Sequence, residues 1–165
     1  RFPRLGIDLS YVNPAGIERD PDGYREMFRR YNINSINICM QSGSQTIVDA
    51  MNRRYRVDAI LRFVDFVREV SPHTLVWTSF MVGYPGETWR DFLATLRIAR
   101  RFHFFEYLSY SPRPGTASAR LESTNSLFTL FLRKKALGVQ FVLQLFFKML
   151  LPAGIRHSGK EVGSK

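Results

Sequence analysis

Strand patterns and helix patterns alternate along the first 110 residues of the chain. Apolar strand patterns begin near residues 5, 36, 74 and 105, and helix patterns lie between them. The clearest helix pattern, from about residue 57 to 70, places Ile60, Phe63 and Val64 on one stripe. Consecutive strands joined by helices form parallel sheets with right-handed crossovers. We therefore predict an α/β fold, either a free four-stranded parallel sheet or part of a (β/α) barrel.

The stretch from residue 74 to 92 combines an apolar strand, a glycine turn and the start of a helix. Its apolar run breaks at the sequence GYPGET, residues 83–88, and an amphipathic pattern begins at Trp89. Thr88 followed by Asp91 predicts an N-cap with a capping box. Ligands of α/β proteins bind at such strand ends, next to helix N-termini. We therefore predict a ligand site at this turn.

A second polar strand end is expected on the same rim. The strand pattern of residues 36–40 ends in QSGS, residues 41–44, and a basic run, RRYR, occupies residues 53–56. Earlier in the chain, Asp20 is the predicted N-cap of a helix, whereas residues 10–19, with Asn13, Pro14 and Gly16, are predicted to be irregular. Barrel enzymes place their chemistry on the rim where the strands end.

The charge of the chain favours an anionic partner. Its 24 Lys and Arg against 14 Asp and Glu give a formal charge of +10, which suits RNA, DNA or a membrane surface, or forms a solvated basic face. Cys39 is the single cysteine, so a metal site of several thiolates is excluded within the chain. The three histidines have no Cys or His neighbour at ligand spacing. We therefore predict no metal-ligating residues here.

Four ordered blocks resemble the radical SAM superfamily. They are QSGS at 41–44, MNRRY at 51–55, VGYPGET at 82–88 and YSPRPGT at 110–116. The resemblance is to the methylthiotransferase branch and to related radical SAM proteins with a cobalamin-binding domain. It implies an α/β partial (β/α) barrel, in which this chain supplies strands three to six of a six-stranded TIM-like barrel. The expected domain is residues 1–120, the C-terminal half of the radical SAM barrel.

The resemblance also implies contacts to S-adenosylmethionine (SAM). Gln41 and Arg53 would hold its amino acid group, the amide by hydrogen bonds and the guanidinium by a bidentate contact with the carboxylate. The turn from Gly83 to Gly86 would let the backbone approach the adenine. Ser79 replaces an acid that relatives use to accept from ribose hydroxyls, and Arg56 replaces a threonine N-cap. No catalytic residue is expected, and the expected cofactor-binding residues are Gln41, Ser42, Gly43, Arg53, Ser79, Gly83 and Gly86.

Members of this family hold a 4Fe–4S cluster with three cysteines, usually in a CxxxCxxC motif. This chain has only Cys39, which lies in a strand pattern and is predicted to be a buried apolar thiol. We therefore expect the chain to be the C-terminal half of a radical SAM domain. The cluster, and any cobalamin, would belong to the full-length parent, with the missing N-terminal half of the barrel as partner.

Two functions are compatible with this pattern. In the first, the chain is a fragment of a methylthiotransferase-like enzyme that performs radical group transfer on tRNA or a small molecule. In the second, it is an inactive half-barrel remnant or a module that binds anions or RNA, as the absent cysteines and Ser79 suggest. No strand pattern of a small β-barrel RNA-binding domain follows residue 116, which favours the cobalamin-domain relatives over a tRNA substrate.

The C-terminal part is predicted to be helical. Residues 127–151 predict one or two helices, divided by the basic residues 133–135, within a helical extension of residues 121–151. Polar residues interrupt their apolar run, so we expect no transmembrane segment, although a basic amphipathic helix on a membrane surface is a weaker alternative. Residues 152–165 are expected to be a flexible basic tail, and the lack of a signal peptide pattern predicts a cytoplasmic protein. The apolar residues expected to pack on the core are Phe141, Leu145, Phe146 and Met149.

Overall fold

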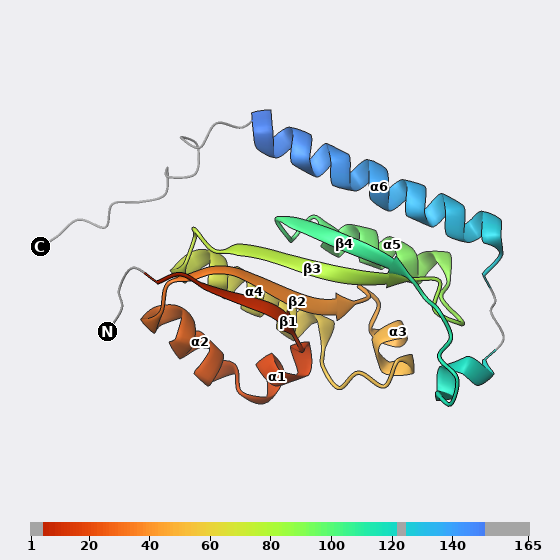
Figure 1. The fold of residues 1–165 in the computed structure, drawn as a ribbon, viewed down its shortest axis with the longest axis horizontal. Helices are drawn as coiled ribbons and strands as arrows, with labels where there is room; N and C mark the ends of the chain where they lie inside the picture. Colours follow the sequence, from red (N-terminus) through yellow and green to blue (C-terminus); the bar gives the residue numbers. More distant parts are fainter. Residues whose placement is uncertain (1–4, 122–124, 151–165) are drawn as a thin grey trace, which may run out of the picture.

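Four parallel strands form a single sheet in the order β1-β2-β3-β4 (Figure 1). The structure is a computed structural model that describes residues 5–121 and 125–150. The strands are β1 Ile7–Val12, β2 Ile33–Gln41, β3 Leu75–Val82 and β4 Phe104–Ser109. Each strand pairs in parallel with the next one along the chain. The predicted α/β architecture with a parallel sheet is therefore confirmed.

Helices fill every connection between the strands. They are α1 Pro14–Arg19 and α2 Pro21–Arg30, then α3 Gln45–Ala50 and α4 Val57–Val70, and then α5 Trp89–Ala99. The prediction that residues 10–19 are irregular was wrong, because β1 continues to Val12 and α1 follows directly. Asn13 caps α1 by accepting a hydrogen bond from the Ala15 amide at 3.1 Å, and Pro14 occupies the first helical position. Asn-Pro begins a helix here instead of breaking the chain.

The core lies between one face of the sheet and the helices that pack on it. Alternate side chains of the strands point to this face and are buried. The apolar stripe of α4 packs against them. In Figure 1, α4 and α5 lie behind the sheet. Burial of this apolar area is the main stabilising contribution to the fold. The buried side chains include Ile36, Ile38, Met40, Val76, Phe80, Val82, Phe105, Ile60, Phe63, Val64 and Val67.

The N-terminus of α5 has the predicted capping box. The Thr88 amide donates to Asp91 Oδ2 at 2.9 Å, and the Asp91 amide donates to Thr88 Oγ1 at 3.3 Å. These bonds satisfy two amide groups that a helix N-terminus otherwise leaves without partners. The start of the helix directly after the glycine turn is thus fixed by sequence-local contacts.

A single continuous helix, α6 Leu127–Leu150, follows the short helix η1 Ala117–Arg120. The basic residues 133–135 do not divide it, because Arg133 is buried in an ion pair while Lys134 and Lys135 face outward. Within the described residues, neither α6 nor any other helix combines the length and apolar character of a membrane span. The predicted tail of residues 152–165 lies outside the described part of the chain.

Helix α6 packs on β4, β3 and α5 through one stripe only. Leu137 is fully buried, and the ring of Phe141 meets that of Phe105 edge-on at 5.7 Å. The expectation that Leu145 and Phe146 pack on the core was wrong, since both are exposed. They lie off the helical stripe that faces the sheet, and the side chain of Met149 is outside the described residues.

Candidate functional site

Polar side chains gather on the sheet face opposite the core helices. Ser79 of β3 is buried and donates a hydrogen bond of 2.5 Å to Oε1 of Glu106, its register partner on β4. On the other side, Asn37 Nδ2 of β2 lies 3.4 Å from Ser79 Oγ. A half-buried carboxylate therefore lies directly beside position 79, although that position itself carries a serine.

Cys39 belongs to the same polar row. Its side chain is half-buried, not fully buried in an apolar site, and its thiol lies 3.7 Å from Asn37 Oδ1. The prediction of an apolar thiol was wrong because position 39 shares its sheet face with Asn37 and not with the core. Burial raises the pKa of Cys39 and the Glu106 charge adds to this, while Ser79 and Arg53 act in the opposite direction.

The glycine turn after β3 adopts the left-handed backbone that its sequence suggests. Gly83 and Gly86 both have φ of 83°, a region that favours glycine. Glu87 is buried and accepts a hydrogen bond of 2.8 Å from the Gly83 amide. The Tyr84 hydroxyl donates to the Ala50 carbonyl at 2.8 Å, which ties the turn to α3. A side chain added at Gly86 would meet open space, so the glycine is required there by its φ.

The end of β2 is held against the N-terminal part of α5. Gln41 ends the strand with φ of 63°, unusual for a residue with a side chain. The Gly43 amide donates to Thr95 Oγ1 at 2.9 Å, and the Ser44 hydroxyl donates to Asp91 Oδ1 at 2.5 Å. A Cβ at Gly43 would approach the Ala94 carbonyl oxygen within 2.6 Å. Gly43 is therefore explained by close packing of two backbones, independently of any ligand.

Ser42 is fully buried beneath this strand end. Its hydroxyl lies 3.3 Å from Thr95 Oγ1 and accepts from the Ser44 amide at 3.1 Å. Its hydrogen bonds therefore serve the loop that connects β2 to α3.

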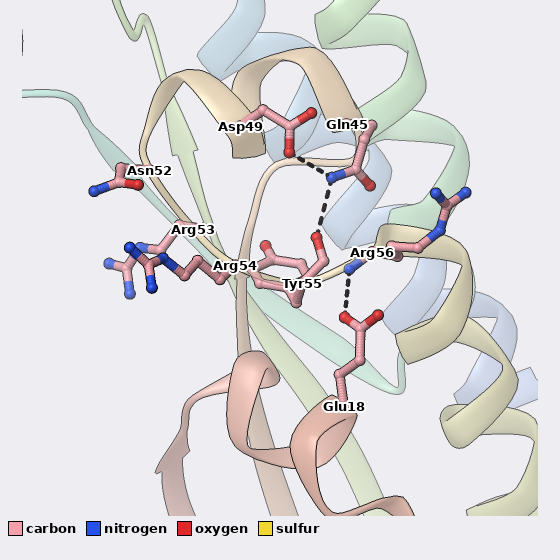
Figure 2. A pocket seen from close by; sticks show the side chains of 8 residues that line it. All are labelled: Glu18, Gln45, Asp49, Asn52, Arg53, Arg54, Tyr55 and Arg56. Atoms are coloured by element: carbon pink, nitrogen blue, oxygen red, sulfur yellow. Dashed lines mark hydrogen bonds between the residues drawn. The ribbon is translucent and has the colours of Figure 1, made fainter.

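Arg53 lies in an open hollow of about 440 Å³ (Figure 2). Arg53 and Arg54 extend to the same side in this view, away from Glu18. Among the residues that the structure describes, neither of these two arginines forms an ion pair. The hollow can therefore offer to an anion two guanidinium groups that form no ion pair, although two carboxylates also line it. It is lined by Glu18, Gln45, Asp49, Asn52, Arg53, Arg54, Tyr55 and Arg56.

Arg56 is the N-cap residue of α4 and makes no side-chain capping bond. Gln45 supplies the missing acceptor, since its Oε1 accepts from the Val57 amide at 2.9 Å. The Arg56 guanidinium instead lies 3.1 Å from Asp58, and its amide donates to Glu18 at 2.6 Å. The N-terminus of α4 is thus capped by the side chain of the first residue of α3.

A buried ion pair connects α6 to the glycine turn. Arg133 Nη1 lies 2.6 Å from Glu87 Oε2, and both side chains are almost completely buried. The same guanidinium donates to Asn125 Oδ1 at 2.7 Å and to the Glu87 carbonyl at 3.0 Å, and it lies over the Trp89 ring at 5.1 Å. Burial raises the pKa of Glu87, against the stabilising effect of the Gly83 amide and Arg133 on its charge.

The structure brings only some of the predicted residues together. Residues 41–43 and the turn at 83–86 end neighbouring strands, whereas Ser79 lies within the sheet face and Arg53 in the hollow. Sequence reasoning missed Asn37, Glu106 and Arg133. The two-residue period of the strands could have placed Asn37 and Glu106 on the face of Ser79. No local signal distinguishes Arg133 from the lysines that follow it.

No metal centre is evident in the part of the chain that the structure describes. Within these residues, no group of three or more His, Cys, Asp or Glu side chains could hold a metal ion. A cluster with three cysteine ligands does not fit a chain whose single cysteine is Cys39.

Comparison with curated proteins finds similar sequences. The chain is 40% identical over 117 residues to the tRNA-2-methylthio-N(6)-dimethylallyladenosine synthase of Mycolicibacterium gilvum (strain PYR-GCK), covering 69% of this chain and 23% of that protein. The synthase of the same name from Paracoccus denitrificans (strain Pd 1222) is 40% identical over 108 residues, covering 57% of this chain and 24% of that protein. The chain thus spans about a quarter of the length of these relatives.

Comparison with solved structures supports the fold. Coproporphyrinogen III oxidase (HemN) from Escherichia coli, described as a radical SAM enzyme, superimposes with a TM-score of 0.65 at 19% identity. The match covers 87% of this chain and 32% of that one, which confirms the predicted partial TIM-like barrel. A family model described as the radical SAM superfamily matches residues 7–99, more than half of the chain. The chain therefore belongs to the radical SAM superfamily.

Proposed function

We propose that this chain supplies the SAM-binding wall of a cytoplasmic, methylthiotransferase-like radical SAM enzyme. One observation carries the proposal. The neighbouring strands β2 and β3 both end in left-handed backbone, at Gln41 with φ of 63° and at Gly83 with φ of 83°. Both ends are linked to the first two turns of α5, through Ser44 and through the chain that leads into Thr88. Such paired strand ends beside a helix N-terminus suit a nucleoside ligand.

Each proposed contact follows from the chemistry of SAM. The Gln41 amide would hold the amino acid group, and the Arg53 guanidinium would bind its carboxylate. The turn from Gly83 to Gly86 would let the backbone approach the adenine. Ser79 is a weak acceptor for ribose hydroxyls, but Glu106 lies 2.5 Å from it and would supply the carboxylate that this position lacks. Ser42 and Gly43 would act by shaping the end of β2.

SAM binding in this family occurs at a 4Fe–4S cluster, which supplies the electron for radical formation. This chain has one cysteine, so the three cluster ligands would come from outside these 165 residues. We also propose that the parent enzyme acts on tRNA or a small molecule. A cobalamin, where the parent binds one, would lie in that parent and outside this chain. The M. gilvum relative is named as a tRNA-modifying synthase, which supports a tRNA substrate.

Neighbouring arginines provide a matched test of the proposal. S-adenosylhomocysteine carries the same amino acid and adenosine groups as SAM and can be titrated calorimetrically into the 165-residue chain. We expect Arg53→Gln to weaken binding by roughly tenfold or more, since a charge-assisted contact contributes well over 1 kcal/mol. Arg54→Gln is the control and should leave binding within about twofold. An equal loss in both variants would contradict the proposed role of Arg53.

The hollow around Arg53 and Arg54 supports a second candidate, an anion- or RNA-binding module. Both guanidinium groups lack an acidic partner among the described residues, in a chain with a formal charge of +10. Either of two neighbouring arginines can make an electrostatic contact with a phosphate. RNA binding through such contacts weakens steeply as the salt concentration rises. Binding of a fluorescent single-stranded RNA should then fall equally in Arg53→Gln and Arg54→Gln. No change in either variant would exclude this role for the hollow.

A further inference from the structure

The outward face of α6 is unusually apolar for a helix that packs on a sheet. Figure 1 shows the helix along one side of the molecule, with one flank toward the sheet and the other away from it. Its large apolar side chains recur at helical spacing on the outward flank and are each between 39% and 68% exposed. From residue 128 to residue 146 they extend for about 27 Å. Contiguous apolar surface of this kind marks an interaction site. These residues, the α6 outer face, are Phe128, Phe131, Leu132, Val139, Val142, Leu143 and Phe146.

The charges on this face are all positive. Lys134 and Lys135 are exposed, and the Lys135 ammonium lies 5.4 Å from the centre of the Phe131 ring. Arg133, next to them, is buried and is compensated by Glu87. The sequence of α6 contains no Asp or Glu. The α6 outer face therefore combines apolar surface with cations that have no acidic partner on the same helix.

A hollow of about 450 Å³ is lined by residues of β4 and α6, and both apolar and basic side chains contribute to it. Tyr107 of β4 lines it from one side, and Lys134 and Lys135 line it from the helix. Its remaining wall is apolar and includes Val139, Val142 and Leu143. Cations beside an apolar wall suit a molecule that has an anionic head and a hydrocarbon chain.

We propose that the α6 outer face docks on the surface of an anionic lipid membrane. A second copy of the chain would bring the lysines of two faces together in a molecule of formal charge +10. A double-helical nucleic acid would compensate the lysines and leave the phenylalanines in water, because its bases are already stacked on one another. An anionic bilayer surface accommodates both, because the aromatic and aliphatic side chains enter the acyl boundary while the lysines meet the headgroups. The helix then lies along the surface and does not cross it.

Vesicle flotation with the 165-residue chain tests this proposal. We expect binding to vesicles of phosphatidylcholine with phosphatidylglycerol, and at least tenfold weaker binding to phosphatidylcholine alone. Phe131→Ser with Val142→Ser should reduce binding to the anionic vesicles at least tenfold. The matched control is Leu93→Ser with Leu108→Ser, two exposed apolar positions outside α6, which should bind as the unaltered chain does. Circular dichroism checks that each variant is folded.

The lysines are tested separately. Lys134→Glu with Lys135→Glu should remove the preference for anionic vesicles, whereas Arg97→Glu with Arg100→Glu, on and just after α5, should retain it. Absence of flotation with anionic vesicles would overturn the proposal. So would sedimentation equilibrium that showed a dimer dissociated by the Phe131 and Val142 changes, since a second copy would then be the occupant. Equal loss in the α6 variants and their controls would show binding by general charge and would also overturn it.

Discussion

Glu87 and Arg133 show how single residues far apart in the sequence hold the glycine turn in place. Glu87 accepts from the Gly83 amide within the turn, and Arg133 brings a compensating charge from α6. Leu130 of the same helix lies against Gly83, where any added Cβ would approach it closely. Two buried charges are tolerated here because each has the other as a partner. The conformation of the proposed adenine-binding turn therefore depends on a helix that follows β4.

Removal of one partner from this pair should be strongly destabilising. Arg133→Met leaves Glu87 buried without its cation, and we expect a loss of roughly 3–5 kcal/mol in the free energy of unfolding in urea. The double variant Glu87→Gln with Arg133→Met should lose less than Arg133→Met alone, because no buried charge remains. An additive loss in the double variant would contradict this coupling.

The raised pKa of Glu87 makes the stability loss of Arg133→Met depend on pH. A raised pKa in the folded state means that the native protein favours the protonated acid, so stability falls as pH rises above the ordinary value of 4.5. Without Arg133 the native carboxylate is less favourable still. The deficit of Arg133→Met in urea unfolding should therefore be larger at neutral pH than at pH 4.5. An equal deficit at both pH values would contradict this effect.

Asp91 should show the opposite pH dependence. Burial acts to raise the pKa of Asp91, but hydrogen bonds from Ser44 and Thr88 outweigh it and hold the pKa below the ordinary value of 3.8. A lowered pKa means that its stabilising effect is present above that value and is lost as pH falls through the lower, folded-state pKa. Asp91→Asn should cost about 1 kcal/mol of stability at neutral pH and progressively less in acid. Thermal melting from neutral pH down to below 3.8 measures this difference, with Asp49→Asn, at an exposed position of α3, as control.

At the scale of the elements, α6 is part of the core and not an appendage to the domain. It contributes Leu137 to the buried cluster and packs Phe141 on Phe105. Two glutamine side chains, Gln140 and Gln144, donate to the Leu96 and Ala99 carbonyls near the end of α5. The boundary predicted at residue 120 therefore separates regions of the sequence, while the core continues across it.

Truncation of one α6 side chain tests whether α6 is part of the core. Leu137→Ala removes a fully buried side chain and should reduce the free energy of unfolding by about 2–5 kcal/mol. Leu143→Ala, at a half-exposed position of the same helix, should change it by less than about 1 kcal/mol. Chemical unfolding followed by the fluorescence of Trp77 and Trp89 measures both. Equal, small effects would mean that α6 is dispensable to the core.

At the scale of the whole molecule, the sheet is covered on one face and has open borders. Within the described residues, β1 has β2 as its only neighbour, so its outer edge is unpaired. The register of β1 is irregular between Ile7 and Asp8 and between Leu9 and Val12, which disrupts a continuous edge. An exposed parallel edge beside a partly polar face remains a site of self-association.

A charge on this edge should therefore increase the solubility of the isolated chain. Ile7→Lys places a lysine on the edge strand at a half-exposed position and should raise the soluble fraction after concentration. Thr46→Lys adds the same charge at an exposed site on α3 and should have little effect. Light scattering and sedimentation velocity compare the two. A monomeric, soluble unaltered chain would show that the edge causes no association.

The sequence by itself determined the elements whose signals are local. The strand and helix periods gave a parallel α/β sheet, and Thr88 with Asp91 gave the capping box, because both depend on residues within one or two turns of the chain. The sequence misplaced residues 10–19, since Asn13 and Pro14 suit a helix start as well as a loop. It also left open whether residues 127–151 form one helix or two, because a buried arginine and a solvated one have the same local pattern.

Only the tertiary structure decided what surrounds each candidate site residue. Ser79 acquires a carboxylate from Glu106, and Arg133 neutralises Glu87, across separations of 27 and 46 residues. Gly43 is required by the approach of α5, and the apolar flank of α6 faces outward because one stripe already fills the contact with the sheet. Sequence periodicity identifies which faces of an element are alike. Packing alone determines which of those faces meets a partner, because it depends on contacts between segments distant in the chain.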